Sequence, residues 1–199
     1  MGYSNNQITC RGCGAPLDIS DRECKFCGGP VNITSIQSVY DMAMPQINKY
    51  ANSYRKELAQ DPDNLETNKA IAFCYLKLKL YDKALPFFEK AVEDNFDDAD
   101  LYLYTAVCML KGKRPFMHQK KTIDRAIEYA NSACMVENKG IFHYFLAYLK
   151  YDYYAMKGLR LNPDYSAELS FAKQIGISET DLIILFETLG TQRPVGNGF

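Results

Sequence analysis

The chain has 199 residues, enough for a small module and one domain with its own hydrophobic core. Hydrophobic residues make up 47% and charged residues 24%, which is typical of a globular protein and excludes a disordered or membrane-embedded class. The formal net charge of -1 gives no overall attraction to nucleic acid or to an anionic membrane. The longest unbroken apolar run, Ala70 to Leu76, is too short to cross a bilayer, so we expect no membrane segment.

The cysteines divide into two groups. Of the 7 in the chain, four form two Cys-x-x-Cys pairs near the N-terminus and three are scattered through helical sequence. The first residues have neither the basic flank nor the apolar run of a signal peptide, and the cysteine count is odd. Both features argue against a disulfide framework and predict a reducing compartment, the cytoplasm.

The two Cys-x-x-Cys pairs belong to one duplicated motif. Its two copies are Cys10-Arg11-Gly12-Cys13-Gly14-Ala15-Pro16-Leu17 and Cys24-Lys25-Phe26-Cys27-Gly28-Gly29-Pro30-Val31. Both read Cys-x-x-Cys-Gly-x-Pro-apolar, and the glycine can take the positive φ that a tight metal-binding turn needs. Two such turns supply four thiolates, the closed tetrahedral set of a structural Zn²⁺ site, with rubredoxin-like iron as the alternative. The segment resembles the short zinc ribbons, which implies a zinc-ribbon domain over residues 1–33 with Cys10, Cys13, Cys24 and Cys27 as ligands.

Zinc ribbons often bind nucleic acid, so the charge of this segment matters. Its bases and acids cancel, since Arg11, Arg22 and Lys25 are balanced by Asp18, Asp21 and Glu23. Four thiolates around one dication then leave the module about two charges negative. Phosphate binding requires the opposite sign, so we expect the ribbon to be structural or a second protein contact.

A helical pattern with a repeat follows over residues 34–164. Asp61-Pro62-Asp63-Asn64 matches Asn95-Phe96-Asp97-Asp98 at an offset of 34 residues, and Ala72 matches Ala106. The unit also contains the small and large residues Tyr75, Tyr81, Ala84, Phe88 and Ala91. This spacing resembles the tetratricopeptide repeat (TPR), although Asn68 stands where that family usually has Trp. The resemblance implies a mostly α-helical solenoid of antiparallel helix pairs.

Residues 165–190 predict a further helix pair. Its spacing resembles a helix-turn-helix, but the second helix, Glu179 to Glu187, has three acids and no base, so DNA would repel it. We therefore expect a capping helix pair that closes the solenoid or a docking surface. Residues 191–199 contain two glycines and predict a flexible tail.

The TPR resemblance implies a groove that binds a protein or a peptide. Phe73, Leu76, Leu103 and Val107 are the candidate partner-binding residues on its apolar inner face, and the alternative is that they pack between adjacent helices. Lys113 and Arg114 are further candidates in the segment 111–121, which has five bases and no acid. This segment is either a solvated turn balanced by the acidic stretch 93–100 or a contact loop for an acidic partner.

No catalytic constellation emerges from the pattern. His118 and His143 lie in no cluster with ligand spacing, and no nucleophile, base and orienting group can be assembled. The sequence therefore predicts a non-enzymatic adaptor for protein partners. The alternative is a nucleic-acid-associated regulator that uses the ribbon or the basic segment 111–121.

Overall fold

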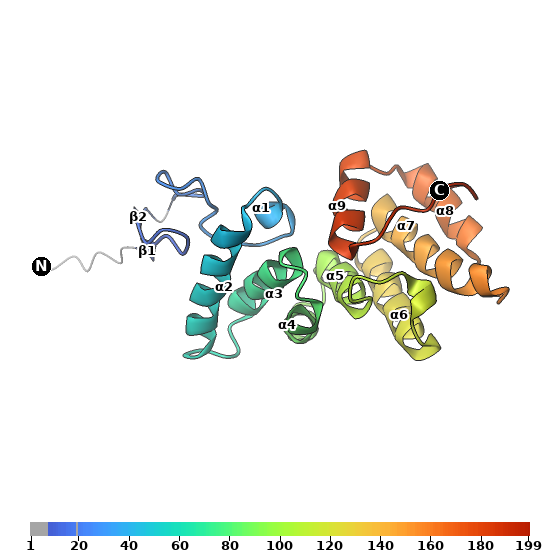
Figure 1. Ribbon diagram of the computed structural model, residues 1–199, viewed down its shortest axis with the longest axis horizontal. Helices are drawn as coiled ribbons and strands as arrows, with labels where there is room; N and C mark the ends of the chain where they lie inside the picture. The colour runs from blue at the N-terminus through green and yellow to red at the C-terminus, as the bar shows by residue number, and fades with distance from the viewer. Residues whose placement is uncertain (1–7, 19) are drawn as a thin grey trace, which may run out of the picture. The chain divides into compact units, whose positions relative to one another are not determined.

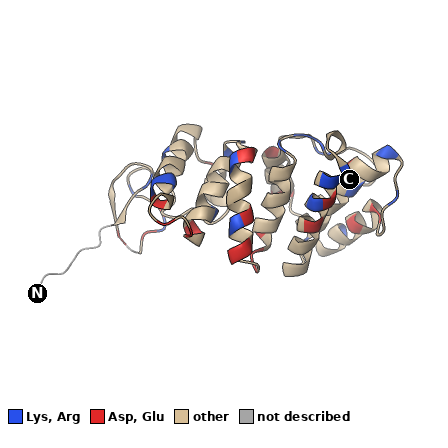
Figure 2. Ribbon diagram, turned by 90° about the horizontal axis from the view of Figure 1, so that it is seen from below, with Lys and Arg blue, Asp and Glu red and all other residues tan. Residues whose placement is uncertain are grey.

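The computed structural model describes residues 8–18 and 20–199 and divides into two compact units, Met1–Leu78 and Lys79–Phe199. The protein is mostly helical, with TPR-like helix pairs and very little strand, as the sequence predicts (Figure 1). Basic and acidic residues are interspersed along the helices (Figure 2). Within the described ranges, no helix combines the length and the apolar character needed to span a bilayer.

The first unit begins with two copies of one turn. Strands β1 (Ile8–Thr9) and β2 (Pro16–Leu17) pair antiparallel around the first copy, and a bridge between Glu23 and Pro30 encloses the second copy at the equivalent positions. The sequence duplication is therefore a duplication of backbone structure.

The glycine that follows each Cys-x-x-Cys pair closes its turn. The Gly14 N–H donates to the Cys10 carbonyl at 2.7 Å, and the Gly28 N–H donates to the Cys24 carbonyl at 2.8 Å. Their φ angles of +78° and +66° lie in the left-handed region, as expected from the motif.

Three helices complete the first unit: α1 (Gln37–Tyr40), α2 (Met44–Leu58) and α3 (Leu65–Lys77). Pro45 occupies the first turn of α2, where its missing N–H costs nothing. α2 and α3 pack against each other, and α2 buries Ile47, Tyr50 and Tyr54. Tyr50 and Tyr54 also carry the contacts between α2 and the duplicated turns.

The two segments that match at an offset of 34 residues each lie directly before the first residue of a helix. The Asn64 side chain accepts a hydrogen bond from the Thr67 N–H at 2.9 Å, directly before α3. At the matching position, the Asp98 side chain accepts from the Asp100 N–H at 3.1 Å, directly before α5 (Ala99–Met109). The repeated polar turn is thus a repeated N-cap.

The second unit is a series of elements in which each α-helix from α4 to α8 packs on the next α-helix. They are α4 (Tyr81–Asp94), α5, the 3₁₀ turn η1 (Pro115–Met117), α6 (Lys120–Val136), α7 (Gly140–Leu149), the π turn η2 (Lys150–Tyr154), the 3₁₀ turn η3 (Ala155–Lys157) and α8 (Tyr165–Ile175). Nearly every residue of α5 and α7 is buried, which is the pattern of helices covered on all sides.

The last helix, α9 (Glu179–Leu189), covers α5 and α7. The Phe186 ring meets the rings of Tyr144 and Tyr148 edge-on, with centroids 6.2 and 5.3 Å apart. The Tyr81 hydroxyl donates to the Thr188 carbonyl at 2.9 Å and ties α9 to α4. The predicted second C-terminal helix therefore lies on the inner helices of its own unit.

Residues 191–199, for which the sequence predicts a flexible tail, contact the second unit. Arg193 donates to the Tyr144 hydroxyl at 3.1 Å and pairs with Glu179 at 3.1 Å. The Phe199 ring lies 5.1 Å from the Tyr151 ring and 5.4 Å from the Tyr144 ring.

The helix faces assigned from the repeat can be tested at Ala84. This residue is fully buried on α4, which packs against α5. Ala84→Leu should lower the free energy of unfolding by about 1–3 kcal/mol because the added carbons overpack a close contact. Lys83→Ala, at the neighbouring exposed residue, should lower the free energy of unfolding by less than about 0.5 kcal/mol. Urea denaturation followed by circular dichroism measures both, and equal midpoints would mean that the faces are assigned wrongly.

Candidate metal centre and partner surfaces

The four N-terminal cysteines converge as their spacing predicts. Their sulfur atoms all lie within 4.8 Å of one another, with Cys10 and Cys27 at 3.6 Å and Cys13 and Cys24 at 3.7 Å. A tetrahedron of thiolates around zinc, with bonds of about 2.3 Å, has edges of about 3.8 Å. Cys10 and Cys24 are buried, while Cys13 and Cys27 are exposed. The donor set and its dimensions fit a closed structural Zn²⁺ site.

Backbone donors favour the thiolate form of Cys10. Burial works against ionisation of Cys10, but the N–H groups of Cys13 and Gly12 outweigh it and lower its pKa to about 6. At Cys27 the Gly29 N–H favours the thiolate, yet burial and the neighbouring sulfur atoms raise the pKa to about 12. A dication that binds the four sulfur atoms would displace the proton that Cys27 retains near neutral pH.

The α2 helix inserts Tyr50 between the two turns. The fully buried Tyr50 hydroxyl donates to the Pro30 carbonyl at 2.6 Å and lies 3.9 Å from the Cys10 sulfur. A Cβ added at Gly12 would lie 2.9 Å from the Tyr50 ring, and one added at Gly29 would lie 2.6 Å from its hydroxyl. Only glycine leaves room for this side chain, and burial raises the pKa of Tyr50, which keeps it a hydrogen-bond donor.

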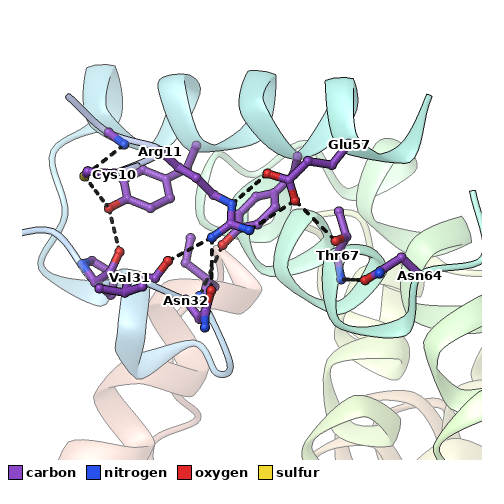
Figure 3. A network of polar contacts seen from close by, with 12 residues as sticks. Cys10, Arg11, Val31, Asn32, Glu57, Asn64 and Thr67 are labelled. Carbon is purple, nitrogen blue, oxygen red and sulfur yellow. Dashed lines mark hydrogen bonds and ion pairs between the residues drawn. The ribbon is translucent and has the colours of Figure 1, made fainter. Parts of the chain in front are cut away.

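Arg11 fastens the first turn to the helices (Figure 3). Its guanidinium forms two hydrogen bonds to the Glu57 carboxylate, at 2.8 and 3.1 Å, and lies 4.8 Å over the Tyr54 ring. It also donates to the Val31 carbonyl and the Asn32 side chain, both at 3.0 Å. This fork joins both turns to α2 and is stronger than a single surface ion pair because it is bidentate and partly buried.

The four apolar candidates for partner binding are all buried. Phe73 and Val107 are 0% exposed, Leu76 is 1% and Leu103 is 3% exposed. Burial favours the alternative in which these side chains pack between helices.

The two basic candidates lie in the loop before α6, and only Lys113 is free of a partner in the described part of the chain. Arg114 donates from Nε at 3.0 Å to the carboxylate of Asp152, whose side chain is 1% exposed. The Phe116 N–H donates to the other oxygen of Asp152 at 2.9 Å. Arg114 therefore holds the loop, and its partner lies too far along the chain for the local pattern to reveal it.

A cavity of about 470 Å³ opens beside α9. Leu182, Ile183 and Phe186 supply its apolar wall, and Ile183 is 48% exposed. Charged side chains of both signs, Lys79, Glu179, Glu187 and Arg193, form its rim. The sequence predicts that the helix containing Leu182 to Phe186 is either a cap or a docking surface. A docking surface needs an opening, and the cavity supplies one.

The remaining thiols and imidazoles serve packing and local hydrogen bonds. Burial raises the pKa of Cys74 and of Cys134 to about 12, so both are protonated near neutral pH. The His143 ring nitrogens lie 3.0 Å from Glu168 and 3.1 Å from Asn138. The His118 ring bonds the Leu110 carbonyl at 2.9 Å.

Comparison with known proteins supports the repeat. The tetratricopeptide repeat family matches residues 51–115. No curated protein matches the chain. Two solved structures of MamA AMB-1 are similar, with TM-scores of 0.52 and 0.53 and 18% identity, covering 70% and 74% of this chain and 84% of theirs. A substituted MamA gives a TM-score of 0.52 at 18% identity, covering 70% of this chain and 83% of its own. Likeness at this identity establishes the TPR-like fold alone.

The metal site predicts a stoichiometry. Protein purified under reducing, metal-replete conditions should contain one zinc ion per chain, measured by inductively coupled plasma mass spectrometry. Cys24→Ser should abolish this content and unfold the duplicated turns, while most of the far-ultraviolet helical signal stays because the helices of the second unit, α4 to α9, bury their own apolar faces. The control Cys134→Ser lies outside the cluster and should keep its zinc. Wild-type zinc near zero would contradict the assignment, and iron in its place would select the alternative metal.

Tyr50 tests whether α2 stabilises the site. Tyr50→Phe removes the hydroxyl that reaches Pro30 and Cys10 while the ring stays between the turns. Release of zinc to a chromogenic chelator should become about tenfold faster, as is usual when an outer-sphere hydrogen bond is lost. The matched variant Tyr129→Phe, at an intermediate-exposure tyrosine on α6, should release zinc at the wild-type rate. Equal rates for all three proteins would limit Tyr50 to packing.

Proposed function

We propose that the protein is a non-enzymatic, cytoplasmic adaptor that binds a partner protein through its helical domain. In this proposal residues 1–33 are a zinc ribbon, residues 34–164 are the TPR-like repeats, and residues 165–190 are the capping helix pair. The observation that carries the proposal is the repeated helix pair itself, with N-caps at Asn64 and Asp98 and a TPR match over residues 51–115. Stacked helix pairs create binding surfaces without requiring any catalytic group.

The partner surface is better sought beside α9 than on the inner helices. Leu103 and Val107 of α5 are buried, and α9 packs on this helix. Ile183, in contrast, reaches the cavity with 48% of its surface exposed and has charges of both signs around it. An apolar anchor inside a charged rim is the usual form of a protein-binding hot spot.

The zinc ribbon is proposed to be structural. Its Arg11 is occupied by Glu57, and Lys25 pairs with Asp21 at 3.0 Å. These pairs leave Arg22 as the remaining base of the described ribbon residues, too little positive charge for phosphate binding. The nucleic-acid alternative therefore has no support from the ribbon, and its remaining candidate is the loop before α6.

Substitutions on α9 and α5 test the adaptor proposal. Ile183→Glu should leave the melting temperature within about 2 °C of wild type because the side chain is half exposed, yet abolish capture of the partner from extracts of the native cell. Leu103→Glu should unfold the second unit because it buries an unpaired charge. The matched control Phe96→Glu, at a 74% exposed side chain between α4 and α5, should keep both fold and partner.

Quantitative mass spectrometry of the three captures, together with thermal melts, separates the outcomes. If Ile183→Glu retains every partner that wild type retains, the cavity beside α9 is not the binding surface. If Leu103→Glu remains folded and loses the partner, the inner groove is the site after all. If neither wild type nor Phe96→Glu enriches any protein over resin without bait, the adaptor proposal itself fails.

A further inference from the structure

The loop between α5 and α6 is held in a defined position by a buried carboxylate that lies under it. Both carboxylate oxygens of the buried Asp152 bind it, one at Arg114 and the other at the Phe116 N–H. The His118 ring bonds the Leu110 carbonyl at 2.9 Å, and η1 forms a turn at the centre. Asp152 lies on the π turn η2, which interrupts the regular helix after α7. The outward side chains of the loop are therefore presented by a supported backbone.

Two apolar side chains project from this supported loop. Phe116 is 41% exposed and Met117 is 70% exposed. The Lys157 ammonium, from η3, lies 4.9 Å from the Phe116 ring centroid and 3.8 Å from the Tyr153 ring centroid. The Lys157 ammonium thus covers one face of each ring. The edge of the Phe116 ring and the Met117 side chain stay open to a partner.

Positive charge around these side chains is only partly compensated. Three bases of the loop have acidic partners, because Lys111 pairs with Asp82, Arg114 with Asp152 and Lys120 with Asp124. Lys113 and Lys121 have no partner among the described residues, and Lys157 contacts rings rather than a carboxylate. None of the pairing acids belongs to the stretch 93–100, so that stretch does not neutralise the loop by direct pairs.

The imidazole of His118 adds no charge to the loop. Burial lowers the pKa of His118, and the charges of Lys113 and Lys111 lower it further. The imidazole is therefore neutral near pH 7 and contributes hydrogen bonding rather than charge.

We propose that Lys113, Phe116, Met117, Lys121 and Lys157 form a docking surface, the loop surface, for an acidic segment of a partner protein that carries an apolar side chain. Three cations without carboxylate partners attract the acidic residues, and Met117 with the edge of Phe116 receives the apolar one. This inference rests on the proposed adaptor function and names the chemistry of its partner. Single-stranded RNA fits less well because Lys157 already covers ring faces on which bases would stack.

The test uses the full chain and a fluorescein-labelled synthetic peptide of Asp and Glu residues around a central Leu-Phe pair. Fluorescence anisotropy should show saturable binding that weakens as salt rises, since exposed charges are screened. Two matched peptides serve as probes of the mechanism: one has Asn and Gln in place of the acids, and the other has Ser in place of Leu-Phe. Both should bind at least about tenfold more weakly than the parent peptide.

Variants locate the binding on the loop surface. The double change Lys113→Glu with Lys121→Glu should weaken peptide binding at least about tenfold, and Met117→Ser about fivefold. Lys83→Glu, the same charge reversal at an exposed lysine of α4 outside the loop surface, should change it less than about twofold. Thermal melts should match wild type because every altered side chain is exposed.

The inference is overturned if the Asn and Gln peptide binds as tightly as the acidic one, or if Lys83→Glu weakens binding as much as the double change. It is also overturned if an RNA oligonucleotide binds more tightly than the peptide and loses affinity in the double variant, which would support the nucleic-acid alternative. The adaptor function is judged separately by partner capture. A partner that is lost with Ile183→Glu but retained with the double variant would leave the adaptor intact and remove the acidic-segment inference.

Discussion

The first unit depends on one close approach, the passage of Tyr50 between the two cysteine turns. Four sulfur atoms can converge only if both turns fold back on themselves, and α2 can reach them only where Gly12 and Gly29 have no side chain. The Tyr50 hydroxyl then bonds the backbone at Pro30, and Arg11 clamps Glu57 a short distance along the same helix. The metal-binding turns and the first long helices therefore share one core, so the stability of α2 and the affinity for zinc should be thermodynamically linked.

In the second unit the corresponding constraint is the apolar character of α5 and α7. Helices that are apolar on every side cannot leave one face open as a groove, and α9 supplies the cover through Phe186 and its contacts with Tyr144 and Tyr148. The two proposed partner surfaces consequently lie at the margins of this cover. They are the cavity beside Ile183 and the loop that Asp152 supports. A helical-repeat fold can thus fill its inner face with its own helices, so that a partner would have to bind elsewhere.

Sequence reasoning succeeded where the chemistry is local. The convergence of the four cysteines follows from a motif with fixed spacing, and the repeat follows from polar N-caps such as Asn64 and Asp98, because a cap acts within one helical turn. It could not tell that Leu103 and Val107 are covered, since the covering helix lies far along the chain and an all-apolar helix has no periodicity to mark its exposed side. Arg114 shows the same limit. The sequence places Arg114 in a basic segment with no nearby acid. Only the folded chain brings Asp152, on a π turn after α7, into contact with it.

The two copies of the duplicated cysteine turn differ in the contacts that their side chains make. At equivalent positions the first copy has Arg11 and Gly12, and the second has Lys25 and Phe26. Arg11 bonds Glu57 of α2, whereas Lys25 pairs only with nearby acids and Phe26 is 73% exposed. The proposed metal site requires only the cysteines and the glycines with positive φ, so the other positions can differ between the two copies. Both copies contact α2, since the Pro30 carbonyl accepts a hydrogen bond from Tyr50, but the bidentate contact of Arg11 has no counterpart at Lys25. A motif that is symmetric in its cysteines is therefore asymmetric in its contacts.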